Sequence, residues 1–231
     1  RFGSLVQRGS FQFATRHERD QRLLERIGMR GAVAPVRGED LLAVIQRNAN
    51  PSKIDAFLDR RIDVEVDWDP TTGAVASSVS VRLTNGAPAN VPNRLQFGNA
   101  SGAPHGSNVT DVSILTPFRL DAVDVDGQRV AAQPLDLGGH WRHTARVTVP
   151  PEGEAIVTFR VSGSVDPGDT YRMRFVGQPL LGENRLFAAV RPSSGRPRSS
   201  SGNPDVHQLD DGTHQLEVDA DGDRVFSWRV G

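Results

Sequence analysis

Apolar and charged residues alternate along a stretch that ends about a third of the way into the chain. From Ile54 to Trp68 the even positions are mostly apolar and the odd positions mostly charged. A period of two places alternate side chains on opposite faces of a β-strand. This run therefore predicts a long strand that begins at Ile54 or Arg60 and ends at Trp68. Its first half is ambiguous, because Ile54, Phe57 and Leu58 also share one face of a helix.

The same alternation recurs, with turn residues between the runs, up to about residue 165. The runs lie at residues 75–83, 109–115, 120–125, 128–132, 141–149 and 155–161. Short alternating strands separated by turns are typical of an immunoglobulin-like β-sandwich. We therefore expect such a sandwich over residues 62–165. Seven side chains should be buried in it: Val64, Val66, Val79, Val81, Val147, Val157 and Phe159.

Residues 1–61 predict a small mixed α/β segment in front of the sandwich. The expected elements are a short strand at 10–14, a helix at 17–28 and a second helix at 39–47. The two helices are predicted because their apolar residues cluster on one helical face. We interpret the segment as the partly helical remnant of an upstream domain. Its apolar side chains should pack on each other, on the sandwich or on another chain, and we favour a small helical subdomain against the sandwich that a partner or the missing upstream region completes.

Residues 166–231 predict additional strands and a final hairpin. Strands are expected at 171–175 and 186–190, and the hairpin pairs residues 215–218 with 224–230. Between them, Arg191–Pro204 is rich in Ser, Gly, Pro and Arg, which favours a mobile loop. A long loop is also expected at 87–106, with one short strand at Arg94–Phe97. The fold class is therefore mainly β.

Charge and cysteine content narrow the function classes. The net charge of −1 gives no sign of the excess of basic residues that is typical of nucleic-acid-binding proteins. The absence of cysteine excludes disulfides and thiolate zinc sites. No apolar run approaches the 18 or so residues of a membrane-spanning helix. We accordingly expect no cofactor, no nucleic-acid partner and no membrane span in this chain.

Several polar clusters have the residue types of reactive sites, but their spacing favours structural roles. His140 and His143 are three apart, so on a strand they would face opposite sides, a poor arrangement for a metal. Asp219–Asp223 resembles the start of a calcium loop, but the twelfth position is Val230 instead of Glu. No nucleophile motif or phosphate loop is present. We therefore assign no catalytic residue and no metal ligand, and expect this chain alone not to be an enzyme.

The best candidates for a binding site are Asn48, Asn50, Lys53 and Asp55. They are close together at a predicted helix-to-strand junction, and Lys53 is the single lysine among 27 basic residues. Amides and a lysine could contact a phosphate or a glycan. The alternative is structural: Asn48 would cap the preceding helix and Lys53 would pair with a nearby aspartate.

These residues lie within the stretch Gly38–Ile62, GEDLLAVIQRNANPSKIDAFLDRRI. It resembles the actinobacterial domain-of-unknown-function family 4012, whose members often read DLL.V..QN.G.NKIDYYL.R, although here Pro51 and Ser52 are inserted. Shorter matches follow in the same order: Asp69–Gly73, Leu83–Asn85, Asn99–Pro104, Leu115–Pro117, Asp126–Gly127 and Gln178–Pro179. Together they cover roughly residues 10–190.

The resemblance implies a secreted protein with an N-terminal membrane anchor and a largely unknown function. The upstream region of such proteins is distantly similar to LytR-CpsA-Psr envelope phosphotransferases. The resemblance assigns no catalytic residue to this chain, which would be a C-terminal portion.

We thus expect a non-catalytic, extracytoplasmic cell-envelope module with a structural or interaction role, anchored upstream. Its partner would be another protein or the missing upstream region, with cell-wall glycan as a further candidate. Two alternatives stay open. The chain could complete an envelope glycopolymer phosphotransferase whose catalytic residues lie upstream, or it could be a carbohydrate-binding sandwich. Only Trp68, Trp141, Trp228 and Tyr171 could serve the latter as planar platforms.

Overall fold

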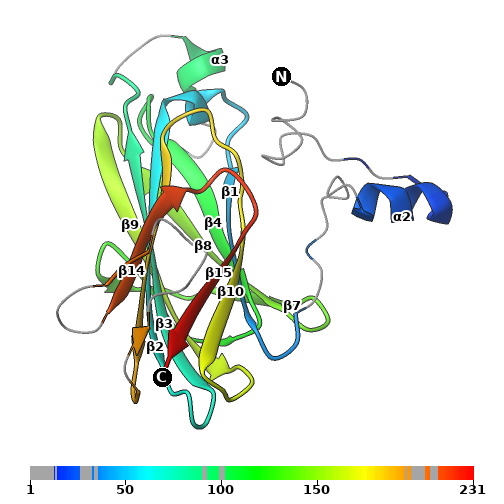
Figure 1. Cartoon of the computed structure of the whole chain (residues 1–231). Coiled ribbons are helices and arrows are strands. Elements are labelled where there is room, and N and C mark those ends of the chain that lie inside the picture. Colours follow the sequence, from blue (N-terminus) through cyan, green and yellow to red (C-terminus); the bar gives the residue numbers. More distant parts are fainter. Residues whose placement is uncertain are drawn as a thin grey trace.

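The computed structural model describes residues 13, 15–26, 33, 36–89, 93–98, 102–195, 197–198, 206–208 and 213–231. The protein is mainly β, as predicted, and consists of two mixed sheets, one of them curled into a half-barrel (Figure 1). The short helix α2 (Glu18–Arg26) lies to one side of the sheets in Figure 1.

Seven strands of the described part form the first sheet. In spatial order they are β12 (Pro197–Arg198), β15 (Arg224–Val230), β10 (Thr170–Val176), β1 (Asp40–Asn48), β4 (Asn108–Thr116), β8 (Trp141–Val149) and β7 (Gln133–Asp136).

Eight described strands form the second sheet. Their order is β13 (Val206–Gln208), β14 (His214–Asp219), β11 (Asn184–Pro192), β2 (Leu58–Trp68), β3 (Ala74–Asn85), β9 (Gly153–Ser164), β5 (Arg119–Val125) and β6 (Gln128–Arg129).

Most neighbouring strands are antiparallel, but each sheet contains a parallel pair. β1 pairs with β10 in the first sheet, and β2 pairs with β11 in the second. A parallel pair needs a long crossover, and here the crossover runs between the N-terminal and C-terminal strands of each sheet. Both sheets consequently combine strands from the beginning, middle and end of the described chain.

The final hairpin predicted between residues 215–218 and 224–230 is wrong, because these segments, β14 and β15, lie in different sheets. β14 pairs with β11 and β13, whereas β15 pairs with β10 and β12, so long-range pairing prevails over the turn between them.

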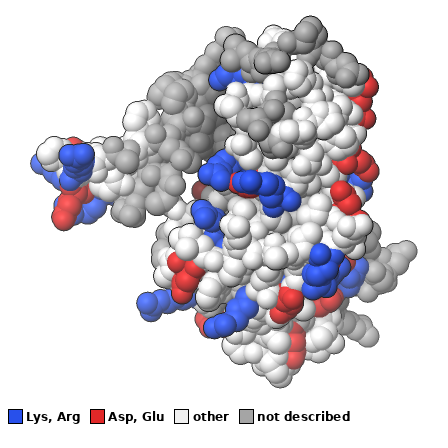
Figure 2. Space-filling model, turned by 180° about the vertical axis from the view of Figure 1, so that it is seen from behind, with Lys and Arg blue, Asp and Glu red and all other residues white. Residues whose placement is uncertain are grey.

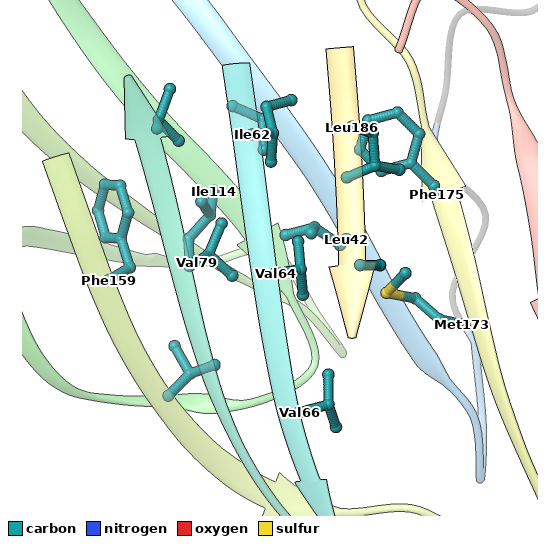
Figure 3. Close-up of a cluster of buried hydrophobic side chains, with 14 of the residues drawn as sticks. Leu42, Ile62, Val64, Val66, Val79, Ile114, Phe159, Met173, Phe175 and Leu186 are labelled. Carbon is teal, nitrogen blue, oxygen red and sulfur yellow. The ribbon is translucent and has the colours of Figure 1, made fainter. Parts of the chain in front are cut away.

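One continuous hydrophobic core fills the space between the two sheets. Leu42 and Ile114 reach into it from the first sheet, and Ile62, Val79 and Leu186 from the second (Figure 3). The seven side chains predicted to be buried are all at most 3% exposed, which confirms that prediction. The strict alternation of β2, buried at every second residue, is the direct outcome of its period-two sequence.

The helix predicted at Glu39–Arg47 is wrong, because Asp40–Asn48 is a strand in the middle of the first sheet. Leu42 and Val44 face the main core, whereas Leu41 and Ala43 pack with Leu115 on the other face. A strand buried on both faces has a continuous apolar run and lacks the period of two. Such a run cannot be distinguished from a short buried helix by its pattern.

The short strand predicted at Arg94–Phe97 is also wrong, because these residues form the single-turn helix α3. The side-chain oxygen of Asn93 accepts a hydrogen bond from the Gln96 backbone N–H at 3.3 Å. This is the capping arrangement of a helix N-terminus. The helical reading of the stretch before β2 is confirmed, since Ile54–Phe57 forms a turn of 3₁₀ helix.

The predicted helix at 17–28 is confirmed over the nine residues of α2. Leu23 is half exposed and Leu24 partly buried, whereas Ile27 and most of the strand predicted at 10–14 lie outside the described residues. Half of the loop predicted at Arg191–Pro204 also lies outside them, and its described half includes the end of β11 and the short strand β12. No helix among the described residues is long and apolar enough to span a membrane.

Candidate functional site

The predicted site residues lie at the end of β1 and in the turn that leads to the 3₁₀ helix. Asn48 organises this turn: its Oδ1 accepts the Asn50 backbone N–H at 2.8 Å, and its Nδ2 donates to the Ser52 carbonyl at 3.1 Å. This is an Asx-type turn, in which a side chain replaces a backbone partner. The helix-capping role considered for Asn48 does not apply, because no helix precedes it.

Asp55 and Lys53 point to different environments. The Asp55 Oδ1 accepts a hydrogen bond at 2.8 Å from Nδ2 of Asn108, which is fully buried at the start of β4. Lys53 is exposed, and no ion pair joins it to any described residue. The pairing of Lys53 with an aspartate is therefore absent from the described part, while Asp55 ties the turn to the first sheet.

Three buried polar atoms beside this turn have no hydrogen-bond partner among the described residues: Asn50 Nδ2, Ser52 Oγ and Asn108 Oδ1. Burying an unpaired polar group is costly. The structure thus brings Asn48, Asn50 and Asp55 together with Asn108 through local hydrogen bonds, and leaves Lys53 at the surface.

A second arrangement of polar residues lies on the outer face of the first sheet, in a groove of about 580 Å³. It crosses β1, β4, β8 and β7. The strand register aligns its residues in rows: Arg47 is opposite Asp111, and Asp111 is opposite Arg146. Two residues further along, Ser113 is opposite Thr144. We call this the arginine groove, and it is lined by Ile45, Arg47, Asp111, Ser113, Ala131, Gln133, Pro134, Leu135, Arg142, Thr144 and Arg146.

Asp111 is the centre of an ion-pair network in the arginine groove. Its Oδ1 accepts from Arg146 Nε at 2.8 Å, and its Oδ2 accepts from Arg47 Nη2 at 2.6 Å and Arg146 Nη2 at 3.2 Å. These hydrogen bonds, with Arg146 contributing most, hold the pKa of Asp111 below its usual range. Asp111 is therefore a carboxylate at neutral pH, and both of its oxygens are engaged.

A different groove, of about 480 Å³, lies on the outer face of the second sheet and contains Arg61, Arg82 and Arg185. The three exposed arginines each have a carboxylate partner: Arg61 pairs with Asp63, Arg82 with Glu154, and Arg185 with Glu217 and Asp219. Arg60 also lines this groove, but it is buried and donates to neutral groups instead. Figure 2 shows that basic and acidic side chains also lie side by side in small groups on the face opposite to the view of Figure 1. Charge is thus largely neutralised locally on the second sheet.

The two histidines considered as metal ligands are both buried. His143 Nε2 lies 3.3 Å from the Phe118 carbonyl oxygen, and burial lowers the pKa of both His140 and His143. No group of three or more potential metal ligands of the His, Cys, Asp and Glu types comes together among the described residues.

The aromatic residues considered as sugar platforms lie mostly in the core. Trp68, Tyr171 and Trp228 are at most 2% exposed and contact one another through tilted ring pairs. Trp141 is only partly buried, with the Arg119 guanidinium carbon 5.5 Å from its ring centroid. Three of the four candidate platforms are therefore unavailable to a ligand.

The arginine groove was missed by sequence reasoning. One signal was present: Arg142, Thr144 and Arg146 occupy the outward positions of the predicted strand 141–149. The decisive partner, Asp111, is on another strand 35 residues away. Without the β4–β8 register, no pattern along the chain connects it with Arg146.

No protein-family model matches the chain, and no curated protein matches it. Solved structures similar to it include a Legionella pneumophila protein described as a putative nutrient binding protein (10% identity, 86% of this chain and 73% of that one covered, TM-score 0.48). Another is yeast LTA4 hydrolase (9% identity, 79% of this chain and 31% of that one covered, TM-score 0.41). A third is an M1 zinc metallopeptidase from Deinococcus radiodurans (10% identity, 74% of this chain and 42% of that one covered, TM-score 0.32). The chain spans less than half of either enzyme. These likenesses are too weak to assign a function to it.

Proposed function

We propose that this chain is a non-catalytic, extracytoplasmic module of a cell-envelope protein, and that it acts by binding another envelope component. The observation that carries the proposal is the arginine groove, most of whose residues extend from β1, β4, β8 and β7 of the first sheet. Binding sites are typically preformed concavities with a few convergent polar groups. The resemblance of Gly38–Ile62 to family 4012 supports the envelope location and an upstream anchor.

The chemistry of the arginine groove favours binding over catalysis. A general base must be able to accept a proton near neutral pH. Asp111 is the carboxylate of the groove, and two arginines hold it in the ionised form with a lowered pKa. Arginine itself stays protonated. The groove can therefore hold and orient a ligand, but its residues are poorly suited to transfer protons.

We also propose the immunoglobulin-like architecture for the sandwich. The facing sheets and the antiparallel run β2–β3–β9 support it. The parallel pairs β1·β10 and β2·β11 are additions to the antiparallel pattern of that class. An experimentally determined strand order tests this part of the proposal. An order without an immunoglobulin-like Greek key would contradict it.

Sedimentation with purified cell envelopes of an actinobacterium tests the functional proposal. We expect the purified chain to sediment with envelopes and to show no turnover of a lipid-linked glycopolymer donor. Serum albumin, mixed with the same envelopes, serves as the control for nonspecific retention. Measurable turnover would favour the alternative of a glycopolymer phosphotransferase. Recovery of the chain entirely in the supernatant would contradict the envelope-binding role.

A further inference from the structure

The arginine groove carries an excess of positive charge. Its lining contains three arginines and one aspartate, so two positive charges are not balanced within it. On the second sheet, by contrast, three arginines pair with four carboxylates: Arg61 with Asp63, Arg82 with Glu154, and Arg185 with Glu217 and Asp219. In the arginine groove, Arg47 and Arg146 share the single carboxylate of Asp111. An uncompensated cationic concavity attracts anions.

At one end of the arginine groove, two guanidinium groups are held in place, but only some of their N–H groups make hydrogen bonds. Asp111, whose side chain is 9% exposed, fixes Arg47 and Arg146, whose side chains are 75% and 64% exposed. Nη1 of Arg146, and Nε and Nη1 of Arg47, make no hydrogen bond to the described residues. These free N–H groups can donate to an oxyanion, for which arginine geometry is well suited.

At the other end lies Arg142, which is exposed and has no carboxylate partner in the described part of the chain. Arg142 and Arg146 are four residues apart on β8 and face the same side. A strand rises by about 3.4 Å per residue, which separates their Cα atoms by about 13 Å. Between them the floor is polar but uncharged, since the Ser113 and Thr144 hydroxyls lie 2.8 Å apart.

We propose that the arginine groove binds an elongated anion that carries oxyanion groups, either phosphates or carboxylates, at two separated points. One group would occupy the free N–H groups of Arg47 and Arg146, and the other would pair with Arg142. The chain between these groups would cross the Ser113 and Thr144 hydroxyls. This inference deepens the proposed function by naming the ligand chemistry, and it rests on that function only for the envelope context.

Isothermal titration calorimetry on the whole chain at low ionic strength tests the inference. The probes are tripolyphosphate, trigalacturonate, inorganic phosphate and the neutral sugar maltotriose. We expect tripolyphosphate, trigalacturonate or both to bind, and maltotriose not to bind. Binding of tripolyphosphate alone assigns the site to phosphate chains, and binding of trigalacturonate alone assigns it to carboxylates. If neither binds, the inference is overturned.

Inorganic phosphate tests the two-point requirement, because it can occupy only one end of the arginine groove. We expect it to bind at least about tenfold more weakly than the elongated probe, since it forgoes one charged contact. Equal affinity would overturn the two-point arrangement.

Three variants locate the site. Arg142→Gln and Arg146→Gln should each weaken binding of the elongated probe about tenfold. The matched control, Arg82→Gln, is on a strand of the other sheet and should change affinity less than twofold. Arg142 makes no ion pair with the described residues, so its variant keeps the test valid even if Arg146→Gln perturbs folding. An equal loss in Arg82→Gln would mean nonspecific attraction and overturn the inference.

The two proposals can fail separately. If the chain sediments with envelopes but binds neither anionic probe, the ligand inference is wrong and the envelope role stands. If it binds the probes through Arg142 but does not sediment with envelopes, the groove is an anion site and the envelope role is wrong.

Discussion

At the residue scale, a buried acid links the neighbouring strands β1 and β10 of the first sheet. Asp40, at the start of β1, is 4% exposed and accepts a hydrogen bond from the Tyr171 hydroxyl of β10. Burial raises the pKa of Asp40 from 3.8 to about 6, although the hydrogen bond from Tyr171 opposes part of this shift. The folded protein therefore binds this proton more tightly than the unfolded chain does.

The raised pKa of Asp40 predicts a specific pH dependence. The stability that protonated Asp40 contributes is fully present below pH 3.8 and is lost as the pH rises through about 6. The shift from 3.8 to about 6 corresponds to a loss of about 3 kcal/mol in the free energy of unfolding. We expect Asp40→Asn to be more stable than wild type at pH 7.5, by up to about that amount, and the difference to shrink towards pH 4.5. Urea unfolding at several pH values measures it, and a difference independent of pH would contradict the assignment.

Arg60 is a buried base that connects the two sheets. It is 2% exposed, and its guanidinium donates to the Val44 carbonyl, to the Gln178 side chain and carbonyl, and to Asn184 Oδ1, at 2.9 to 3.2 Å. Desolvation lowers its pKa to about 10, so it remains charged at neutral pH. The alternation from Ile54 to Trp68 places Arg60 on the apolar face, but no sequence pattern indicated its partners.

Replacing Arg60 should therefore destabilise the protein more than replacing its neighbour. Arg60→Met leaves several buried acceptors without a donor, and we expect it to lower the free energy of unfolding by about 3 kcal/mol. Arg61→Met is the matched control on the other face of β2, where the exposed pair with Asp63 should contribute less than about 1 kcal/mol. Chemical denaturation compares the two, and similar losses would refute the role given to Arg60.

At the element scale, β2 and β1 show what periodicity can and cannot predict. β2 was predicted because one of its faces is charged, which gives a clear period of two. β1 is buried on both faces over Asp40–Val44, so that signal is absent. Its strand form depends on β4 and β10, which pair with its two edges from distant parts of the sequence. Local propensity is a weak determinant when tertiary contacts oppose it.

Rates of amide hydrogen exchange should differ clearly between β1 and α2. β1 is an interior strand with neighbours on both sides, and its amides should open only with a large part of the sheet. α2 has nine residues and a half-exposed Leu23, and a helix of this length is marginal by itself. We expect exchange in β1 to be roughly 100-fold slower than in α2 or more. Mass spectrometry of peptides from both segments measures this, and comparable rates would argue against an interior β1.

At the scale of the whole molecule, the sequence predicts the class and much of the core but not the sheet order. Period-two runs identify the strands that have one apolar face, and their buried residues follow directly. The parallel pairs β1·β10 and β2·β11 join segments more than a hundred residues apart, which alternation cannot reveal. The two candidate sites also differ in whether the sequence reveals them. The Asn48–Asp55 turn is local and visible in the sequence, whereas the Arg47–Asp111–Arg146 row exists only through strand register.

This interleaving of strands predicts that the central segment does not fold by itself. A chain of residues 62–165 would lack β1, β10 and β15 from the first sheet, and β11 and β14 from the second. The core would lose fourteen buried side chains: Leu42, Val44, Leu58, Tyr171, Met173, Phe175, Leu186, Ala188, Val190, Leu216, Val218, Ala220, Phe226 and Trp228. Burying one large apolar side chain contributes about 1.5–3 kcal/mol, so their combined loss exceeds the net stability of a typical domain, about 5–15 kcal/mol.

The remaining strands would also expose unpaired edges at β2 and β4, a recognised route to aggregation. We expect the 62–165 chain to show no cooperative thermal transition and to bind the dye ANS, whereas residues 36–231 unfold in one transition. Circular dichroism and dye fluorescence measure both. A cooperative transition in the short chain would mean that the middle segment is an independent sandwich and that the flanking strands are additions to it.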